Sequence, residues 1–134
     1  MKILVISDTH IPHRAKDLPR EIWEIAQKVD MVVHAGDFTT KEVLVELQSI
    51  NPEVKAVWGN MDEPELVEIL PEKLVFEVEG KKIGVTHGSG APWRIEKRVM
   101  EKFQDEKLDE LIFGHSHQAL MKREKDLLLF NPGS

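Results

Sequence analysis

Apolar residues along this chain follow two kinds of pattern. The first is a short continuous run rich in β-branched residues, which is typical of a buried strand. Such runs predict strands over residues 2–6, 31–34, 54–58, 83–86 and 111–113. The second pattern places apolar residues three and four positions apart, as on the inner face of an amphipathic helix. It predicts helices that alternate with the strands.

The helical pattern occurs in four segments. The first helix has Asp17 as a candidate cap, and the second opens at Thr39 or Thr40. Two more helices are predicted over residues 63–70 and 92–107. The inner faces of the first, second and fourth helices carry Ile22, Ile25, Ala26 and Val29; Val43, Leu44, Leu47 and Ile50; and Ile95, Val99 and Phe103.

Two hairpins follow residue 71. Alternating apolar positions over residues 74–78 indicate a half-buried strand, which leads through a turn at 79–82 into the strand 83–86. Segments 119–121 and 127–130 predict a second hairpin around the polar turn 122–126. The earlier alternation of strands and helices is the pattern of right-handed crossovers onto a parallel sheet. We therefore expect a single α/β domain over residues 1–134, with mixed sheets covered by helices.

The composition excludes several classes of protein. The 134 residues include no cysteine, which excludes a disulfide framework and a thiolate zinc site and fits a reducing cytoplasm. The formal net charge of −6 argues against stable nucleic-acid binding, which needs a basic surface. No apolar run approaches the roughly 18 residues that span a membrane, and the N-terminus does not resemble a signal peptide. We expect a cytoplasmic protein without a membrane anchor, and homo-oligomerisation stays open.

Five of the predicted strands end in residues that favour metal ions. These ends read Asp8-Thr9-His10, Gly36-Asp37, Gly59-Asn60, His87-Gly88 and Gly114-His115-Ser116-His117. Ligands in open α/β folds gather outside the carboxyl ends of the strands, so we expect these donors to converge. The candidate metal ligands are two carboxylates, one amide and four imidazoles: Asp8, Asp37, Asn60, His10, His87, His115 and His117.

Seven donors exceed what one ion needs and suit two ions that share a ligand. Asp37 lies near the middle of the set, and a carboxylate has two oxygens, so Asp37 is the candidate bridging ligand. Nitrogen and oxygen ligation without sulfur favours Mn, Fe, Ni or Zn over Ca or Mg, and of these we favour manganese. Two ions roughly 3.5–4 Å apart would hold a bridging hydroxide and clamp a phosphoryl group for in-line displacement.

Taken singly, these residues also have structural explanations. Asp8 and Asp37 are suited to capping helices or forming turns, and His87 is suited to a satisfied place in the core. We expect His34 to be structural. His13 is a weaker candidate for donating a proton or holding phosphate, because histidines in loops are usually only solvated. Packing in the core or at an interface is expected of the three tryptophans, Trp23, Trp58 and Trp93.

The five motifs, in this order, resemble those of the calcineurin-like metallophosphoesterase superfamily. The short chain is most similar to its small phosphodiesterase branch, which is related to the retromer scaffold subunit. The resemblance implies a four-layer α/β/β/α sandwich with the helices outside. It also implies that one ion takes Asp8, His10, Asp37 and His117, and that the other takes Asp37, Asn60, His87 and His115. The resemblance also implies that Asn60 touches the substrate phosphate. The predicted catalytic residues are Asn60 and His87.

Two features depart from the family pattern. Many members carry a histidine where this chain has Met61, and that histidine helps to protonate the leaving group. Met61 cannot transfer a proton, which points away from difficult leaving groups or towards another donor. The small branch often has another residue there. The chain also stops at Ser134, where members usually continue, so either the sequence is shortened or the domain lacks the usual C-terminal strand.

The sequence favours a divalent-metal-dependent phosphoesterase, with a phosphodiester preferred over an activated monoester. Its nucleophile would be a hydroxide that bridges two metal ions. The alternative is a non-catalytic scaffold of the same fold that binds partner proteins. A scaffold under no catalytic demand can lose imidazoles, whereas every expected donor is present here. The substrate could be a cyclic nucleotide, a nucleic-acid end or another small diester.

Overall fold

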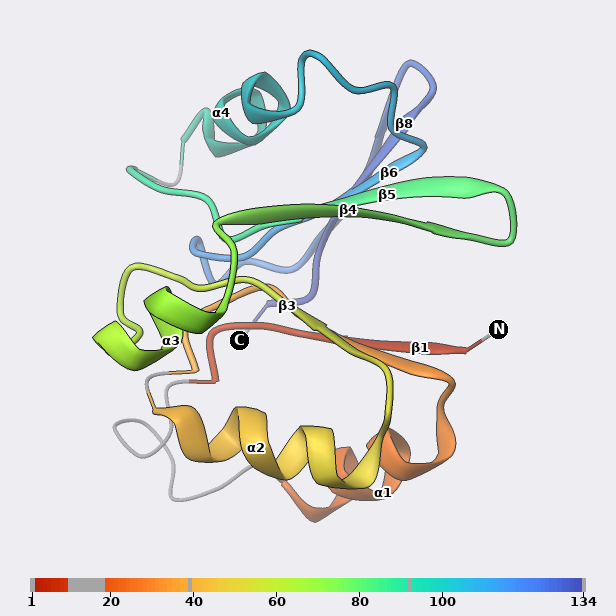
Figure 1. The fold of residues 1–134 in the computed structure, drawn as a ribbon. Coiled ribbons are helices and arrows are strands. Elements are labelled where there is room, and N and C mark those ends of the chain that lie inside the picture. The colour runs from red at the N-terminus through yellow and green to blue at the C-terminus, as the bar shows by residue number, and fades with distance from the viewer. Residues whose placement is uncertain (1, 10–18, 39, 92, 134) are drawn as a thin grey trace.

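A computed structural model describes residues 2–9, 19–38, 40–91 and 93–133. Within them the strands form two sheets that lie face to face (Figure 1). The first sheet is parallel and has the order β1 (Ile3–Ile6), β2 (Met31–His34) and β3 (Val54–Ala56), with Ile3 opposite Met31 and Val32 opposite Val54. This parallel arrangement confirms the crossovers predicted from the strand–helix alternation.

The second sheet is mixed and has five strands in the order β4-β5-β6-β8-β7. Its strands are β4 (Lys73–Val78), β5 (Lys81–Thr86), β6 (Glu110–Ile112), β7 (Leu120–Glu124) and β8 (Leu127–Asn131). The two predicted hairpins, β4–β5 and β7–β8, are antiparallel, whereas β6 runs parallel to both β5 and β8. The carboxyl ends of β5 and β6 therefore lie at the same edge of this sheet.

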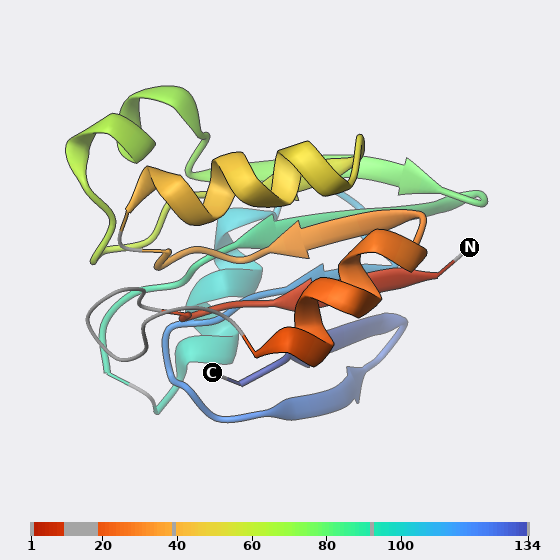
Figure 2. The same cartoon turned by 90° about the horizontal axis from the view of Figure 1, so that it is seen from below.

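Helices cover the outer faces of both sheets. Helices α1 (Arg20–Lys28) and α2 (Lys41–Ile50) lie side by side on the outer face of the first sheet (Figure 2). Helix α4 (Ile95–Lys102) lies over the second sheet, and the short α3 (Pro64–Ile69) lies beside the loops at one end (Figure 1). The order of layers is helix, sheet, sheet, helix, which confirms the predicted α/β/β/α sandwich.

Three apolar clusters fill the spaces between the four layers, and alternation along the strands assigns residues to them. In β2, Val32 packs against the α1 and α2 layer, whereas Met31 and Val33 pack between the two sheets. In β6, Ile112 faces the other sheet and Leu111 packs with α4. A strand buried on both faces reads as a continuous apolar run, which is why these short segments could be recognised from the sequence.

Some predicted boundaries were wrong. The helix expected over 92–107 occupies only Ile95–Lys102, because the chain turns after it: the N–H of Glu106 bonds to the carbonyl of Phe103 at 2.9 Å. The polar turn expected over 122–126 is shorter, since Lys122 to Glu124 pair with β8. An edge strand exposed to water does not require apolar residues, so its polar sequence concealed it.

Of the residues predicted to begin the first two helices, only one can be compared with the structure. The predicted cap Asp17 and the alternative start Thr39 lie outside the described residues. Thr40 occupies the N-cap position of α2 but makes no side-chain capping hydrogen bond. The third strand ends at Ala56 instead of residue 58, although the N–H of Val57 still bonds to the carbonyl of His34 at 3.2 Å.

Candidate metal centre

The predicted donors follow strands of both sheets and lie at one end of the sandwich. Asp8 follows β1 and Asp37 follows β2, while His87 and His115 follow β5 and β6 of the other sheet. The carboxyl ends of these strands lie at the left of Figure 1. The sheet topology thus brings together residues that are far apart in the sequence.

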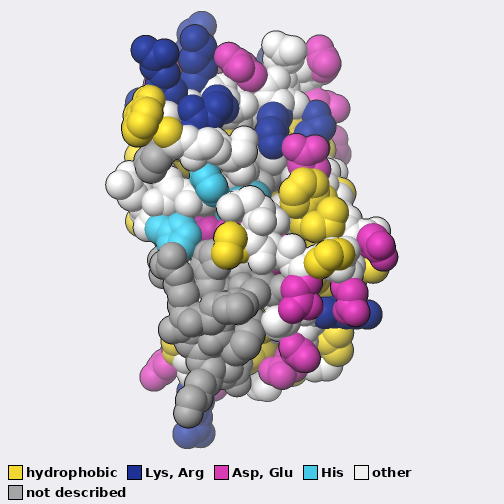
Figure 3. All heavy atoms as spheres, turned by 90° about the vertical axis from the view of Figure 1, so that its left-hand side faces the viewer, with side chains coloured by type: hydrophobic (Ala, Val, Ile, Leu, Met, Phe, Trp, Pro, Cys, Tyr) yellow, Lys and Arg dark blue, Asp and Glu magenta, His cyan; other side chains and the backbone are white. Residues whose placement is uncertain are grey.

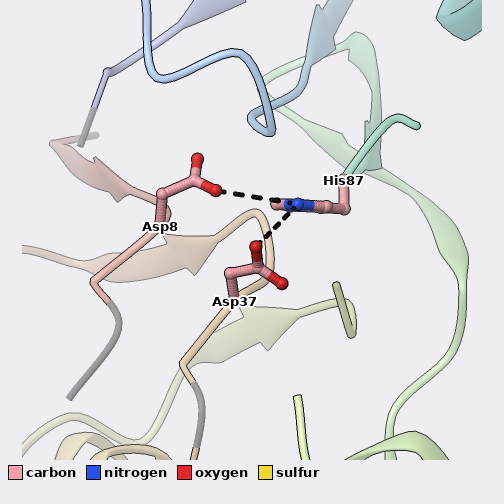
Figure 4. A group of neighbouring side chains, drawn as sticks. All are labelled: Asp8, Asp37 and His87. Atoms are coloured by element: carbon pink, nitrogen blue, oxygen red, sulfur yellow. Dashed lines mark ion pairs between the residues drawn. The ribbon is translucent and has the colours of Figure 1, made fainter. Parts of the chain in front are cut away.

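Asp8, Asp37 and His87 form the centre of this site (Figure 4). One ligand atom from each of them lies within 4.8 Å of the corresponding atoms of the other two. The Nε2 atom of His87 is 3.2 Å from Oδ2 of Asp37 and 3.6 Å from Oδ1 of Asp8. All three side chains are buried.

Three more predicted donors surround this buried group. The Oδ1 atom of Asn60 lies 3.1 Å from Nε2 of His87 and 3.2 Å from Nδ1 of His115. The Nε2 atom of His117 lies 3.4 Å from Oδ1 of Asp8. Six of the seven predicted metal ligands are therefore brought together, and the seventh, His10, lies outside the described residues.

The more exposed donors open the site to solvent. Asn60 is exposed, and His115 and His117 are partly exposed, whereas the carboxylates are buried behind them. Histidine side chains are visible on this face of the molecule, with basic side chains above them (Figure 3). A small ligand can approach from the side of Asn60 and the two histidines.

The backbone at the donors adopts an unusual conformation. The φ angles of Asp8, Asp37, His115 and His117 are 53°, 62°, 70° and 60°. This left-handed region is uncommon for residues other than glycine, and such strain gathers at functional sites. The bends let each chain segment turn sharply after its strand and direct its side chain into the site.

Glycines of the motifs make room for the carboxylates. A Cβ atom on Gly59 would lie 2.2 Å from Oδ1 of Asp37, and one on Gly114 would lie 2.7 Å from Oδ2 of Asp8. Gly36, at φ +100°, would place a Cβ 2.8 Å from Nδ1 of His87. Each donor therefore occupies space that only glycine leaves open.

Several supporting residues were not found from the sequence. The carboxylate of Asp62 accepts the N–H groups of Asp37 at 2.9 Å and of Gly59 at 2.8 Å. The N–H of Met61 donates to Oδ1 of Asp37 at 2.8 Å, and the hydroxyl of Ser7 donates to Oδ2 of Asp8 at 2.9 Å. The only sequence signal for Asp62 was its place two residues after Asn60.

The hydrogen bonds of the histidine rings determine which nitrogen faces the centre. Nδ1 of His87 lies 2.7 Å from the carbonyl of Ala35, and Nε2 of His115 lies 2.8 Å from the carbonyl of Gly90. A carbonyl only accepts, so each of these nitrogens carries the proton. Nε2 of His87 and Nδ1 of His115 face the amide oxygen of Asn60, and each can bind a metal once it has given up its proton, as is usual for histidines held by a second hydrogen bond.

The electrostatics of the centre call for positive charge. Burial lowers the pKa of His87, but the hydrogen bond and charge of Asp37, the charge of Asp8 and the carbonyl of Ala35 together raise it above 6.5. Two neighbouring buried carboxylates are costly without compensating charge. Divalent cations would supply that charge, and carboxylate, amide and imidazole donors suit them. The residues present thus fit a metal centre.

Other predicted residues lie apart from this group or stay untested. His34 is fully buried, stacks on Phe38 with ring centroids 3.5 Å apart and accepts the N–H of Gly36 at Nδ1, which agrees with a structural role. His13 lies outside the described residues. Trp23 packs against the core, whereas Trp93 is 73% exposed and does not, so packing at an interface stays the prediction for Trp93.

The chain belongs to the calcineurin-like phosphoesterase superfamily, whose domain profile matches residues 1–134. A probable metallophosphoesterase from Methanothermobacter thermautotrophicus is 38% identical over 134 residues, which cover 100% of this chain and 77% of the relative. A phosphodiesterase from Methanocaldococcus jannaschii is 31% identical over 147 residues, covering 99% and 83% of the two chains.

A relative that is not named as an esterase has a solved structure. Vps29 from Entamoeba histolytica in complex with zinc is 30% identical and superposes with a TM-score of 0.79, covering 98% of this chain and 73% of Vps29. The predicted family is thus confirmed, with relatives named as phosphodiesterases and as Vps29. In the described part of the chain, no helix is both long and apolar enough to cross a membrane.

Proposed function

We propose that this chain is a divalent-metal-dependent phosphodiesterase with two metal ions, of which manganese is the preferred one. The observation that carries the proposal is the convergence of Asp8, Asp37 and His87, whose ligand atoms lie within 4.8 Å of one another in a buried group. When bound, the ions would supply a hydroxide nucleophile and a Lewis acid for the phosphoryl group.

We assign the side chains to two groups, one for each of the two proposed cations. His117 lies beside Asp8, whereas Asn60 lies between His87 and His115. Asp37 contacts His87 and has a second carboxylate oxygen, so we assign it as the shared ligand. His10 completes the first group in our proposal.

Asn60 is proposed to bind the substrate as well. Its Oδ1 atom faces the two imidazoles, which leaves the N–H groups of Nδ2 as donors for a phosphate oxygen. His87 occupies the position between this amide and the buried carboxylates. We therefore retain Asn60 and His87 as the catalytic residues.

Met61 restricts the substrates that this site can hydrolyse. Its side chain is 55% exposed beside the centre and has no group that transfers a proton. Diesters with stable leaving-group anions need no protonation, and they should be hydrolysed fastest. Substrates with poorly stabilised alkoxide leaving groups should be hydrolysed slowly.

The scaffold remains the second candidate, because Vps29 shares the fold and has been crystallised with zinc. Metal binding alone therefore does not distinguish an enzyme from a scaffold. The test is hydrolysis of bis(p-nitrophenyl) phosphate with Mn²⁺ or Ni²⁺ added and with EDTA. We expect activity with the metals, loss of activity in EDTA, and loss of activity in Asp37→Ala.

The matched control is Asp105→Ala, which removes an exposed carboxylate outside the site. It should retain the wild-type rate. Equal rates in the metal, EDTA and Asp37→Ala samples would favour the scaffold. In that case, the ligands to search for would be partner proteins and not phosphate esters.

A further inference from the structure

A cavity of about 110 Å³ adjoins the proposed centre. Gly59, Asn60, His87 and Gly88 form the wall nearest the metal ligands. The remaining lining residues are Trp58, Glu72, Thr86, Ser89 and Lys102. An ester group on a phosphate bound at Asn60 and His87 can therefore extend directly into this space.

An ion pair lies in the wall of the cavity. The ammonium of Lys102 is 2.9 Å from a carboxylate oxygen of Glu72. Lys102 is the last residue of α4, and Glu72 precedes β4, so the pair joins two different elements. Both side chains keep some contact with solvent, with 28% of Lys102 and 58% of Glu72 exposed.

The backbone on both sides of this ion pair is held in place. The hydroxyl of the buried Thr86 donates to the carbonyl of Glu72 at 3.3 Å. The ammonium of Lys73 donates to the carbonyl of Lys102 at 2.6 Å. The backbone that carries both members of the pair is thus held before any ligand arrives, which lowers the cost of binding one.

The chemistry of the wall selects among possible ligands. A second anionic group is disfavoured because Glu72 already neutralises Lys102. A purely apolar group would leave the pair without new partners and would strip water from it. A hydroxyl group suits both members, since it can accept from an ammonium and donate to a carboxylate. Trp58 adds an apolar surface for the C–H groups of such a ligand.

The size of the cavity sets a further limit. Its volume has room for a few water-sized groups. This is the size of a small polyol unit, and a bulkier group would extend past the partly exposed Lys102 and Glu72 into solvent. The volume and the wall chemistry together favour a short, hydroxyl-bearing chain.

We propose that the cavity lined by Trp58, Glu72 and Lys102 binds a hydroxyl-bearing, polyol-type ester group of the substrate. This subsite rests on the proposed phosphodiesterase function and narrows its substrate class. The phosphate lies at Asn60 and His87, and the hydroxyl groups of the ester contact the Lys102–Glu72 pair. A substrate without hydroxyl groups binds at the metal centre, but the cavity adds nothing to its affinity.

The test compares two phosphate monoesters of equal charge and similar size. Glycerol 3-phosphate carries two hydroxyl groups, and n-propyl phosphate carries none. Their affinities are measured by isothermal titration calorimetry with the Mn²⁺-loaded protein, which requires no turnover. We expect glycerol 3-phosphate to bind about tenfold more tightly, as a hydrogen bond to a charged group implies. Equal affinities for the two ligands would overturn the proposal.

Lys102→Met keeps the apolar stem of the side chain and removes its charge. In this variant the affinity ratio should fall towards one, through weaker binding of glycerol 3-phosphate alone. Glu72→Gln provides a second variant and should reduce the ratio in the same direction. Lys97→Met, at an exposed position of the same helix, should keep the wild-type ratio. An unchanged ratio in both cavity variants would contradict the assignment.

The same samples separate this proposal from the proposed function. Hydrolysis of bis(p-nitrophenyl) phosphate by the wild-type protein, together with equal affinities for the two ligands, would reject the subsite alone. Absence of hydrolysis under all metal conditions would reject the enzyme. A retained preference for glycerol 3-phosphate would then still support the subsite as a ligand-binding cavity.

Discussion

The Nδ1 N–H of His87 donates to the carbonyl of Ala35 at 2.7 Å, and this hydrogen bond turns Nε2 towards the carboxylates. The ring therefore keeps the same orientation whether it is protonated or neutral. As an imidazolium it donates to Asp37, and as a neutral imidazole it presents a lone pair at the same place. Proton and metal compete for this nitrogen.

This competition predicts how stability depends on pH. The pKa of His87 in the folded, metal-free protein is raised, since the pull of Asp37 and Asp8 outweighs burial. Its contribution to the free energy of unfolding is therefore complete below about pH 6.5, the value for an unfolded histidine, and is lost as the pH rises through the folded pKa. Urea unfolding in EDTA should show this loss, and His87→Asn should reduce it.

Saturating Mn²⁺ provides the internal control for this experiment. Metal ligation requires neutral imidazole, so stability should then rise with pH over the same range. A metal-free protein that becomes more stable between pH 6.5 and 8, with an equal slope in His87→Asn, would contradict the account of this ring.

Asp62 is predicted to act on the metal through Asp37. Its carboxylate accepts the N–H groups of Asp37 and Gly59 and so holds both donor-bearing loops. Asp62→Ala should weaken Mn²⁺ binding by about 10–100-fold, as is typical when support for a metal ligand is removed. Asp109→Ala is the matched control, because Asp109 also accepts a backbone N–H, from Lys82, but outside the site. Equal Mn²⁺ affinities in the two variants would exclude this role.

Gly59→Ala tests whether the centre needs the space that this glycine leaves. The new Cβ would lie 2.2 Å from Oδ1 and 2.6 Å from the backbone nitrogen of Asp37, so both the carboxylate and the loop that carries it must move. We expect the variant to fold but to lose Mn²⁺ binding, as measured by calorimetry. Gly84→Ala places its Cβ 2.6 Å from Cδ1 of Leu108 in the core, and it should lower the melting temperature while retaining the metal. Retained binding in Gly59→Ala would show that the loop adjusts freely.

Arg98 is predicted to position His115 through the loop before α4. Its guanidinium donates to the carbonyls of Ser89 and Trp93 at 2.9 and 3.1 Å and also to that of Ala91. The carbonyl of Gly90, within the same loop, fixes the His115 ring. Arg98→Ala should weaken Mn²⁺ binding by about tenfold, whereas Lys97→Ala should not. Titration calorimetry measures both, and unchanged affinity in Arg98→Ala would remove this role.

The convergence of the donors was predictable because it depends on topology. Parallel strands bring their carboxyl ends to one edge, so a polar residue after each apolar run, such as Asp8 or Asp37, indicates the site without knowledge of the packing. The same reasoning works across the two sheets because β5 and β6 also end there. Seven donors scattered over the chain predicted the site, and the six that the structure describes lie together.

The supporting contacts could not be predicted in this way. Asp62 and Arg98 act on backbone groups of loops, and such hydrogen bonds leave no periodic pattern in the sequence. The end of α4 at Lys102 and the end of β7 before Lys125 also depend on how the chain turns. Polar composition alone does not reveal these turns. The exposure of Trp93 was missed because a bulky aromatic residue favours burial on average.

The number of Mn²⁺ ions bound per chain, measured by titration calorimetry, tests the central claim most directly. Asp37→Asn keeps an oxygen that can accept the N–H of Met61 but removes the charge that we assign to both ions. We predict two ions for the wild-type protein and for the control Asp105→Asn, and loss of binding in Asp37→Asn. A wild-type chain that binds no ion, or an Asp37→Asn variant that binds two with unchanged affinity, would contradict the account.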